Sequence, residues 1–330
     1  MNPKIISVVT GASGFVGSHV VDRLLSEGHH VKCILRETSS KRWLEGKPVE
    51  IINSGLTDKE NLRKVLSGAD YLYHIAGVVK SKREDGYFKG NVETTSNLLD
   101  VLCEVNTNIK RVIIVSSLTA CGPSYDNKIC NEETIEHPIT TYGRSKLTQE
   151  QLAKKYMDKL PITIIRPPAV YGPRDTEIYL VFKMYKMGLM TLIGFNKKVL
   201  SLVYIDDLVD GIYTASVSEK AINQTYFISA KEINDWKQVG GYIGEALGRK
   251  ALYLRLPHFL VYTVAAVAQF LALFSSKAAT MNLEKARDFV QESWTCDITK
   301  AEKELGFRQR VPTKEGIKKS IDWYRQMKWL

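Results

Sequence analysis

The sequence predicts an α/β protein in which a doubly wound parallel sheet is joined to a smaller, mostly helical C-terminal lobe. Strand and helix signals alternate through the first two-thirds of the 330 residues. A glycine-rich turn also connects the first strand signal, residues 5–9, directly to the first helix. Such alternation implies parallel strands covered by helices on both faces, with ligands at the carboxyl ends of the strands.

The individual elements follow from apolar runs and from amphipathic patterns. We expect further strands at 30–35, 49–53, 70–76, 111–116 and 162–166, and helices at 16–26, 59–66, 92–104 and 142–160. From about Tyr171 the pattern becomes irregular, although 239–247 and 314–325 again indicate helices. We therefore expect a first domain over 1–170, to which 200–215 return, and a cap lobe over 171–330.

The turn after the first strand reads TGASGFVG over residues 10–17. Gly11 allows a tight turn, Gly14 lets the backbone approach a pyrophosphate, and Gly17 lets the helix pack closely on the strand. The helix N-terminus offers free N–H groups and a positive dipole end to the phosphates. The sequence therefore predicts a Rossmann-type dinucleotide-binding unit.

Composition and charge exclude several classes of protein. The net charge is +10, but the basic residues are scattered and accompany no recognition motif, so nucleic acid is not expected as a partner. The charge favours attraction to an anionic cofactor and allows contact with an anionic membrane surface. Five cysteines without metal-ligand spacing indicate a reducing compartment and no metal site. No signal peptide precedes the first strand, so we expect a cytoplasmic protein with possible membrane association.

Three residues form a candidate catalytic group. Tyr142 and Lys146 stand at positions i and i+4, so a helix presents both on one face, and Ser117 follows the 111–116 strand. A nearby ammonium favours the phenolate and is expected to lower the pKa of Tyr142 toward the working range. A serine hydroxyl beside the same oxygen would hold a carbonyl or alcohol in line. Together these groups permit hydride transfer with proton transfer on the adjoining oxygen.

At this point the sequence resembles the extended short-chain dehydrogenase/reductases, the NAD-dependent epimerase/dehydratase superfamily, over essentially its whole length. The motifs that carry the resemblance are TGASGFVG at 10–17, HIAG at 74–77, SSLTACG at 116–122, YGRSK at 142–146, RPPAVYGP at 166–173 and VYIDDL at 203–208. The RPP form and the end of the chain are similar to the 3β-hydroxysteroid dehydrogenase and dihydroflavonol reductase branch.

The resemblance implies roles for residues of this chain. Tyr142 would be the general acid/base, Lys146 would bind the nicotinamide ribose and tune Tyr142, and Ser117 would orient the reacting oxygen. Asp58 would meet the adenine, although a helix N-cap is an alternative role for it. Asn91 is a candidate for stabilising the backbone near the active site. The cofactor-binding residues implied are Gly11, Ser13, Gly14, Phe15, Val16, Gly17, Arg36, Leu56, Asp58, Ala76, Gly77, Ser116, Tyr142, Lys146 and Pro167.

The end of the second strand favours NADP(H) over NAD(H), which stays possible. Relatives that prefer NAD carry an acidic residue there, but this chain has Leu35 followed by Arg36. Arg36 and the basic loop behind it suit a 2′-phosphate. A solvated basic loop is the alternative interpretation.

Two features favour an apolar alcohol or ketone, such as a sterol, lipid or phenolic, as substrate. Sugar-nucleotide enzymes of the family usually carry an Asn where this chain has Ala169. The segment 259–274 is almost wholly apolar and too short to span a bilayer, so it is a core helix, a lid or a membrane contact. The alternatives are a nucleotide-sugar epimerase, dehydratase or reductase, and a cofactor-binding scaffold without turnover. The family also implies a homodimer through the 92–104 and 142–160 helices.

Overall fold

A computed structural model describes residues 4–125, 128–274, 279 and 281–330. Its main body is a parallel sheet of seven strands in the order β10-β6-β5-β4-β1-β2-β3. These strands are β1 (Ile6–Thr10), β2 (His30–Leu35), β3 (Val49–Asn53), β4 (Tyr71–His74), β5 (Arg111–Val115), β6 (Ile162–Arg166) and β10 (Thr225–Phe227). The predicted α/β class with a doubly wound sheet is confirmed.

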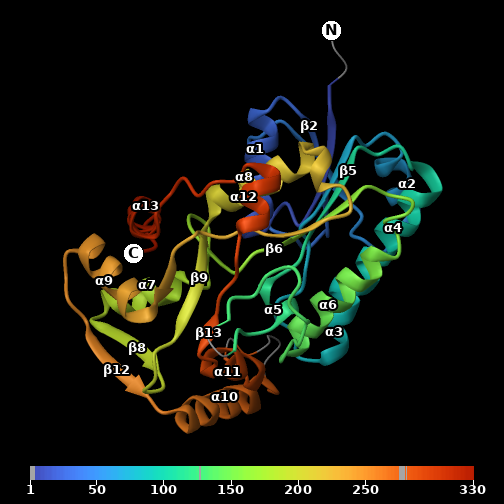
Figure 1. Cartoon of the computed structure of the whole chain (residues 1–330). Helices are drawn as coiled ribbons and strands as arrows, with labels where there is room; N and C mark the ends of the chain where they lie inside the picture. Colours follow the sequence, from blue (N-terminus) through green and yellow to red (C-terminus); the bar gives the residue numbers. More distant parts are fainter. Residues whose placement is uncertain (1–3, 126–127, 275–278, 280) are drawn as a thin grey trace.

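Helices cover both faces of this sheet because neighbouring strand residues alternate between faces. Val8 packs with Leu62 and Leu98, whereas the adjacent Val9 packs with Val20 on the opposite face. The first group of helices comprises α2 (Lys59–Leu66), α4 (Thr94–Val105) and α6 (Thr141–Lys154), and the second comprises α1 (Phe15–Ser26) and α8 (Ile205–Val217). Figure 1 shows these two helical layers on either side of the strands.

Short helices lie at the carboxyl edge of the sheet. They are α3 (Glu84–Phe88), the π-helix η1 (Lys89–Glu93) and α5 (Leu118–Cys121). The helix predicted at 92–104 thus begins with a widened turn, and the helix predicted at 142–160 ends earlier, at Lys154. Both differences fall at helix ends, where the apolar pattern gives little guidance.

The remaining elements form the cap lobe beside the carboxyl edge. Strand β9 (Val199–Tyr204) pairs with β7 (Ala169–Tyr171), β11 (Ile233–Asp235) and β13 (Ser293–Trp294), and β8 (Leu189–Ile193) pairs with β12 (Leu252–Leu256). The helices here are α7 (Tyr179–Lys186), α9 (Trp236–Leu247), α10 (His258–Ala272), α11 (Leu283–Val290) and α13 (Thr313–Gln326). The short η2 (Glu219–Ala221) and α12 (Thr299–Leu305) lie beside β10.

The chain returns to the main body within the predicted segment 200–215, at the start of α8. Strand β9 belongs to the cap, while α8 packs on α1 and β10 pairs with β6. The domain limits themselves stay a prediction.

Helix α10 is not the buried core helix that one interpretation of the 259–274 segment suggested. Only Val261 and Ala265 of this helix are buried, and Phe259 is 71% exposed. No helix in the described part of the chain is long and apolar enough to cross a membrane.

Candidate active site

The glycine-rich turn is shaped for close backbone contacts. Gly11 has φ +71°, and a Cβ there would lie 2.6 Å from the backbone nitrogen of Ala76. A Cβ on Gly17 would meet the Gly11 carbonyl oxygen at 2.1 Å, so the start of α1 lies directly on the loop. No larger residue fits either position.

The N-terminus of α1 fits a dinucleotide's pyrophosphate. The helix begins at Phe15 after Gly14, where no side chain caps it, and its first turn carries no acidic residue. Gly14 is exposed, and Ser13, Phe15 and Val16 are half-buried beside it. The N–H groups of this turn can therefore hold phosphate oxygens.

The predicted adenosine-side residues lie where β2 and β3 end. Asp58 caps α2, accepting bonds from Asn61 N at 3.1 Å and Asn61 Nδ2 at 2.6 Å, so the alternative cap role is confirmed. The backbone bond from Asn61 lowers the pKa of Asp58. The Leu56 carbonyl accepts from Asn97 Nδ2 at 3.1 Å, and Arg36 is exposed. The adenine contact of Asp58 and the phosphate contact of Arg36 stay predictions.

The structure places Ser117 beside Tyr142, and Lys146 follows one turn later on α6. Ser117 begins α5, where its Oγ accepts from Thr119 N at 3.2 Å and from Thr119 Oγ1 at 2.9 Å. Thr140 caps α6 by accepting from Gly143 N, so Tyr142 stands in the first turn. The Tyr142 hydroxyl is hydrogen-bonded to Ser117. The Leu118 N–H donates to the Pro167 carbonyl at 2.8 Å. This bond holds the RPP turn next to Ser117.

Lys146 is 2% exposed and lies one turn beyond Tyr142. Its Nζ donates to the Val115 carbonyl at 2.8 Å and to the Gln149 side chain. A Cβ on Gly77 would lie 3.8 Å from this Nζ, so the ammonium group lies next to the HIAG loop. Burial lowers the pKa of Lys146 to about 8, opposed by the charge of Glu150.

The expected lowering of the Tyr142 pKa is not found in this structure. Burial raises the pKa of Tyr142 to about 12, and the bond with Ser117 opposes that rise. The Lys146 ammonium is meanwhile held by Val115 and Gln149. A phenol with this pKa is protonated at neutral pH.

A buried ion pair supports α6 behind these residues. Arg166 Nε lies 3.0 and 3.1 Å from the two carboxylate oxygens of Glu150, and Nη2 lies 2.6 Å from one of them. Ser116 Oγ also donates to Glu150, so the hydroxyl expected near the cofactor is engaged on this side. Both charged side chains are almost fully buried. The pair joins β6 to the helix that carries Tyr142 and Lys146.

Asn91 clamps the loop that follows β4. Its Oδ1 accepts from Val78 N at 2.6 Å, and its Nδ2 donates to the Val78 carbonyl at 3.2 Å and to Ser145 Oγ at 2.9 Å. Its own carbonyl accepts from Thr95 Oγ1 at 2.6 Å. Asn91 therefore stabilises the backbone beside Ala76 and Gly77, as the sequence suggested.

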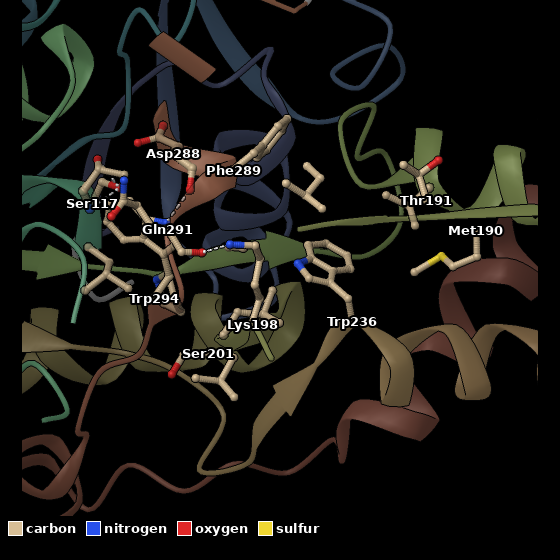
Figure 2. Close-up of a pocket in the computed structure, with 18 of the residues that line it drawn as sticks. Ser117, Met190, Thr191, Lys198, Ser201, Trp236, Asp288, Phe289, Gln291 and Trp294 are labelled. Atoms are coloured by element: carbon tan, nitrogen blue, oxygen red, sulfur yellow. Dashed lines mark hydrogen bonds between the residues drawn. The ribbon is translucent and has the colours of Figure 1, made fainter. Parts of the chain in front are cut away.

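A pocket of about 380 Å³ begins at Ser117 and extends into the cap (Figure 2). Most of its walls are apolar, and Ala169 lies among them. The side chains that the cap contributes include Val181, Met184, Met190, Ile193, Leu200, Trp236, Phe289 and Trp294. Sequence reasoning named few of these residues, because they come from six separate elements.

Asp288 is the main functional candidate that sequence reasoning missed. It lies on α11 and lines the pocket together with Ser117. Its Oδ1 is buried and has no hydrogen-bond partner in the described structure. Burial raises the pKa of Asp288 to about 7, and the negative charge of Asp288 in turn raises the pKa of Tyr142. No sequence motif marks this position, since it depends on how α11 packs.

Helix α11 is fixed against the catalytic helix. The Thr141 N–H donates to the Glu284 carboxylate, and Trp294 Nε1 donates to the Asp288 carbonyl at 2.9 Å. Lys198 Nζ donates to the carbonyls of Val290 and Gln291 at the end of α11. Asp288, one turn after Glu284, is therefore held on the side of α11 that faces the site.

Comparison with known protein families identifies the family of this chain. Residues 7–229 match the model of the NAD dependent epimerase/dehydratase family. The chain belongs to this family, and it is an enzyme of the extended short-chain dehydrogenase/reductase type that uses a nicotinamide dinucleotide.

Individual relatives are distant but align over most of the chain. The chain is 23% identical to "Ceramide reductase" of Caulobacter vibrioides, covering 98% of this chain and 96% of the relative. It is 24% identical to "2-alkyl-3-oxoalkanoate reductase" of Shewanella oneidensis, covering 94% and 84%. The structure of UDP-glucuronic acid 4-epimerase from Bacillus cereus superposes with a TM-score of 0.78 at 23% identity, covering 98% and 99%, which shows the shared fold.

Proposed function

We propose that this enzyme interconverts an alcohol and a ketone on an apolar small molecule, with NADP(H) as its preferred cofactor. The apolar pocket that begins at Ser117 is the observation that carries this proposal. A sugar diphosphate would need polar partners that these walls offer sparsely, and Ala169 supplies no amide. The names of the two reductases among the relatives support a lipid ketone as the substrate class.

Each predicted catalytic residue has a separate role in the proposed reaction. The bound cofactor supplies or accepts the hydride. Ser117 donates a hydrogen bond that orients the substrate carbonyl, and protonated Tyr142 gives its proton to the oxygen as negative charge develops there. Lys146 holds the ribose and keeps a positive charge beneath the site. Because the phenol is protonated at neutral pH, it can give this proton when a ketone is reduced.

A substrate panel tests this function. NADPH consumption would be measured with a long-chain 3-ketolipid, a 2-alkyl-3-oxoalkanoate, a 3-ketosteroid and UDP-glucose. We expect turnover of at least one lipophilic ketone. Conversion of UDP-glucose, with no response to any ketone, would establish the nucleotide-sugar alternative instead. The homodimer stays a prediction, to be measured in the same preparation by light scattering.

Replacement of Arg36 with alanine is expected to raise KM for NADPH by about 10- to 100-fold and to leave KM for NADH nearly unchanged. A bond between a guanidinium and a phosphate contributes about 1.5–3 kcal/mol, and only NADPH carries the 2′-phosphate. Lys186→Ala, which removes an exposed basic side chain at the end of α7 in the cap, is the control. Equal effects on the two cofactors would remove Arg36 from the specificity.

The raised pKa of Asp288 predicts that kcat for reduction depends on pH. Below pH 7 its carboxyl group is neutral; above pH 7 it is charged, which raises the pKa of Tyr142 and opposes negative charge on the substrate oxygen. We expect kcat to fall by roughly 3- to 10-fold between pH 6 and pH 8. Asp288→Asn should lose the decline near pH 7 and keep a later one near pH 8 from Lys146.

The control for this variant is Asp322→Asn on α13, which should keep the wild-type pH profile. A wild-type profile in Asp288→Asn would mean that the carboxyl group does not act on the reaction. Because the folded state favours protonated Asp288, stability should also fall as pH rises from about 4 to 7 in the wild type. Asp288→Asn should lack that fall in a thermal melt.

A further inference from the structure

The outer face of α10 is an apolar surface that no part of the described chain covers. Eight of the 24 large apolar residues that are exposed in the described structure lie in or directly after this helix. We call them the α10 surface: Phe259, Leu260, Val264, Val267, Phe270, Leu271, Leu273 and Phe274. The helix contains no charged residue. A helix facing water normally carries charged residues on its outer side, so this face is adapted to another environment.

Only the inner face of α10 packs against the rest of the described protein, which leaves its outer face uncovered. Val261 and Ala265 pack with Ala286 of α11, and these three residues form a small core of their own. Figure 1 places α10 at the edge of the molecule beneath α11, at the opposite end from α8. The outer face of α10 is therefore accessible to a partner along the whole helix.

Charge around the α10 surface favours an anionic partner. Residues 246–283 contain four basic residues and no acidic one. Arg249 and Lys250 precede β12, Arg255 lies within it, and all three are exposed. Leu252 on the same strand is 70% exposed, so the apolar area continues beyond the helix. An apolar face with a basic margin is the pattern of a helix that lies in the headgroup region of an anionic bilayer.

The α10 surface also adjoins the pocket. Ile193 packs beneath α10 and lines the pocket. Phe289 of α11 lines the pocket as well and is partly open to solvent. Apolar side chains thus connect the exposed helix with the cavity that begins at Ser117.

We propose that this enzyme docks on an anionic phospholipid surface through α10 and takes its apolar substrate from that surface. The proposal rests on the proposed function for the substrate, but docking itself requires no turnover. Burial of each large side chain contributes up to about 1.5–3 kcal/mol, so several of them suffice for reversible binding. A second copy of the chain is the alternative occupant of this face, and light scattering without lipid separates it from a lipid surface.

Co-sedimentation with vesicles tests the docking. The full chain would be mixed with phosphatidylcholine vesicles containing about one-third phosphatidylglycerol, and with vesicles of phosphatidylcholine alone. We expect binding to the first kind, weakened by salt. Val267→Glu should weaken it at least about tenfold, since a charge enters the apolar face. Val217→Glu, at the end of α8, is the matched control, because Val217 is 48% exposed and Val267 is 53% exposed.

The outcomes separate docking from catalysis and from self-association. Absence of vesicle binding, or equal binding by the two variants, would overturn the proposal whatever the enzyme reduces. Loss of a dimer in Val267→Glu, measured by light scattering without lipid, would assign the α10 surface to a second copy. If vesicles bind but no ketone is reduced, the docking stands and the proposed substrate class fails.

Discussion

Tyr142→Phe is expected to lower kcat for ketone reduction by about 10²–10⁴-fold, the range that a positioned acid contributes. The variant keeps the ring, which lies 6.4 Å from that of Tyr87, and removes only the hydroxyl group that is bonded to Ser117. Steady-state kinetics with NADPH would measure the loss. Cofactor affinity, followed by NADPH fluorescence, should be nearly unchanged because the phosphate loop and Lys146 remain.

Tyr87→Phe is the matched control for Tyr142→Phe. The Tyr87 hydroxyl is bonded to the Ser81 backbone and to Asn282, and not to Ser117, so its removal should change kcat little. If Tyr142→Phe turned over like the wild type, the phenol would have no part in proton transfer and the proposed function would lose its acid. Loss of NADPH binding in this variant would instead mean that the substitution disturbs the loop.

Glu150→Gln is expected to lower the free energy of unfolding by about 3–5 kcal/mol, the cost of breaking a buried ion pair from one side. Arg166 would keep only Glu136, which is 29% exposed, as a charged partner. Urea unfolding would measure the change. The exposed pair of Glu60 and Lys64 supplies the control, since Glu60→Gln should cost about 0.5 kcal/mol or less.

The same variant has a second consequence for Lys146. The charge of Glu150 raises the pKa of Lys146 against the effect of burial, so its loss should move the alkaline limb of the rate profile below pH 8. Replacing Glu150 and Arg166 together with leucine and methionine should recover much of the lost stability. If Glu150→Gln were no less stable than Glu60→Gln, the ion pair would not support α6.

The nucleotide-binding half could be predicted closely because its signals are local. The strands at 30–35, 49–53 and 162–166 occur with the predicted bounds, and Gly11 and Gly17 stand where a Cβ would not fit. The spacing of Tyr142 and Lys146 on a helix is likewise a local property. Such features need no knowledge of distant parts of the chain.

The cap could not be predicted in the same way. An apolar helix without charged residues has the same sequence whether it is covered or exposed, so the sequence could not choose between a core helix, a lid and a membrane contact for α10. Asp288 acquires its surroundings only when α11 packs beside α6. The direction of the pKa change at Tyr142 also depended on depth of burial, which spacing does not encode.

One irregular turn decides where the loop beside the cofactor lies. The π-helix over Lys89–Glu93 holds one more residue between bonded groups than an α-helical turn does. Deleting a residue there would restore regular winding but rotate the preceding segment by about 100° relative to α4. Asn91 would then swing away from Val78, and Gly77 would lose its anchor. A single additional residue in η1 thus sets the position of the loop that contains Gly77, although η1 contributes none of the predicted catalytic side chains.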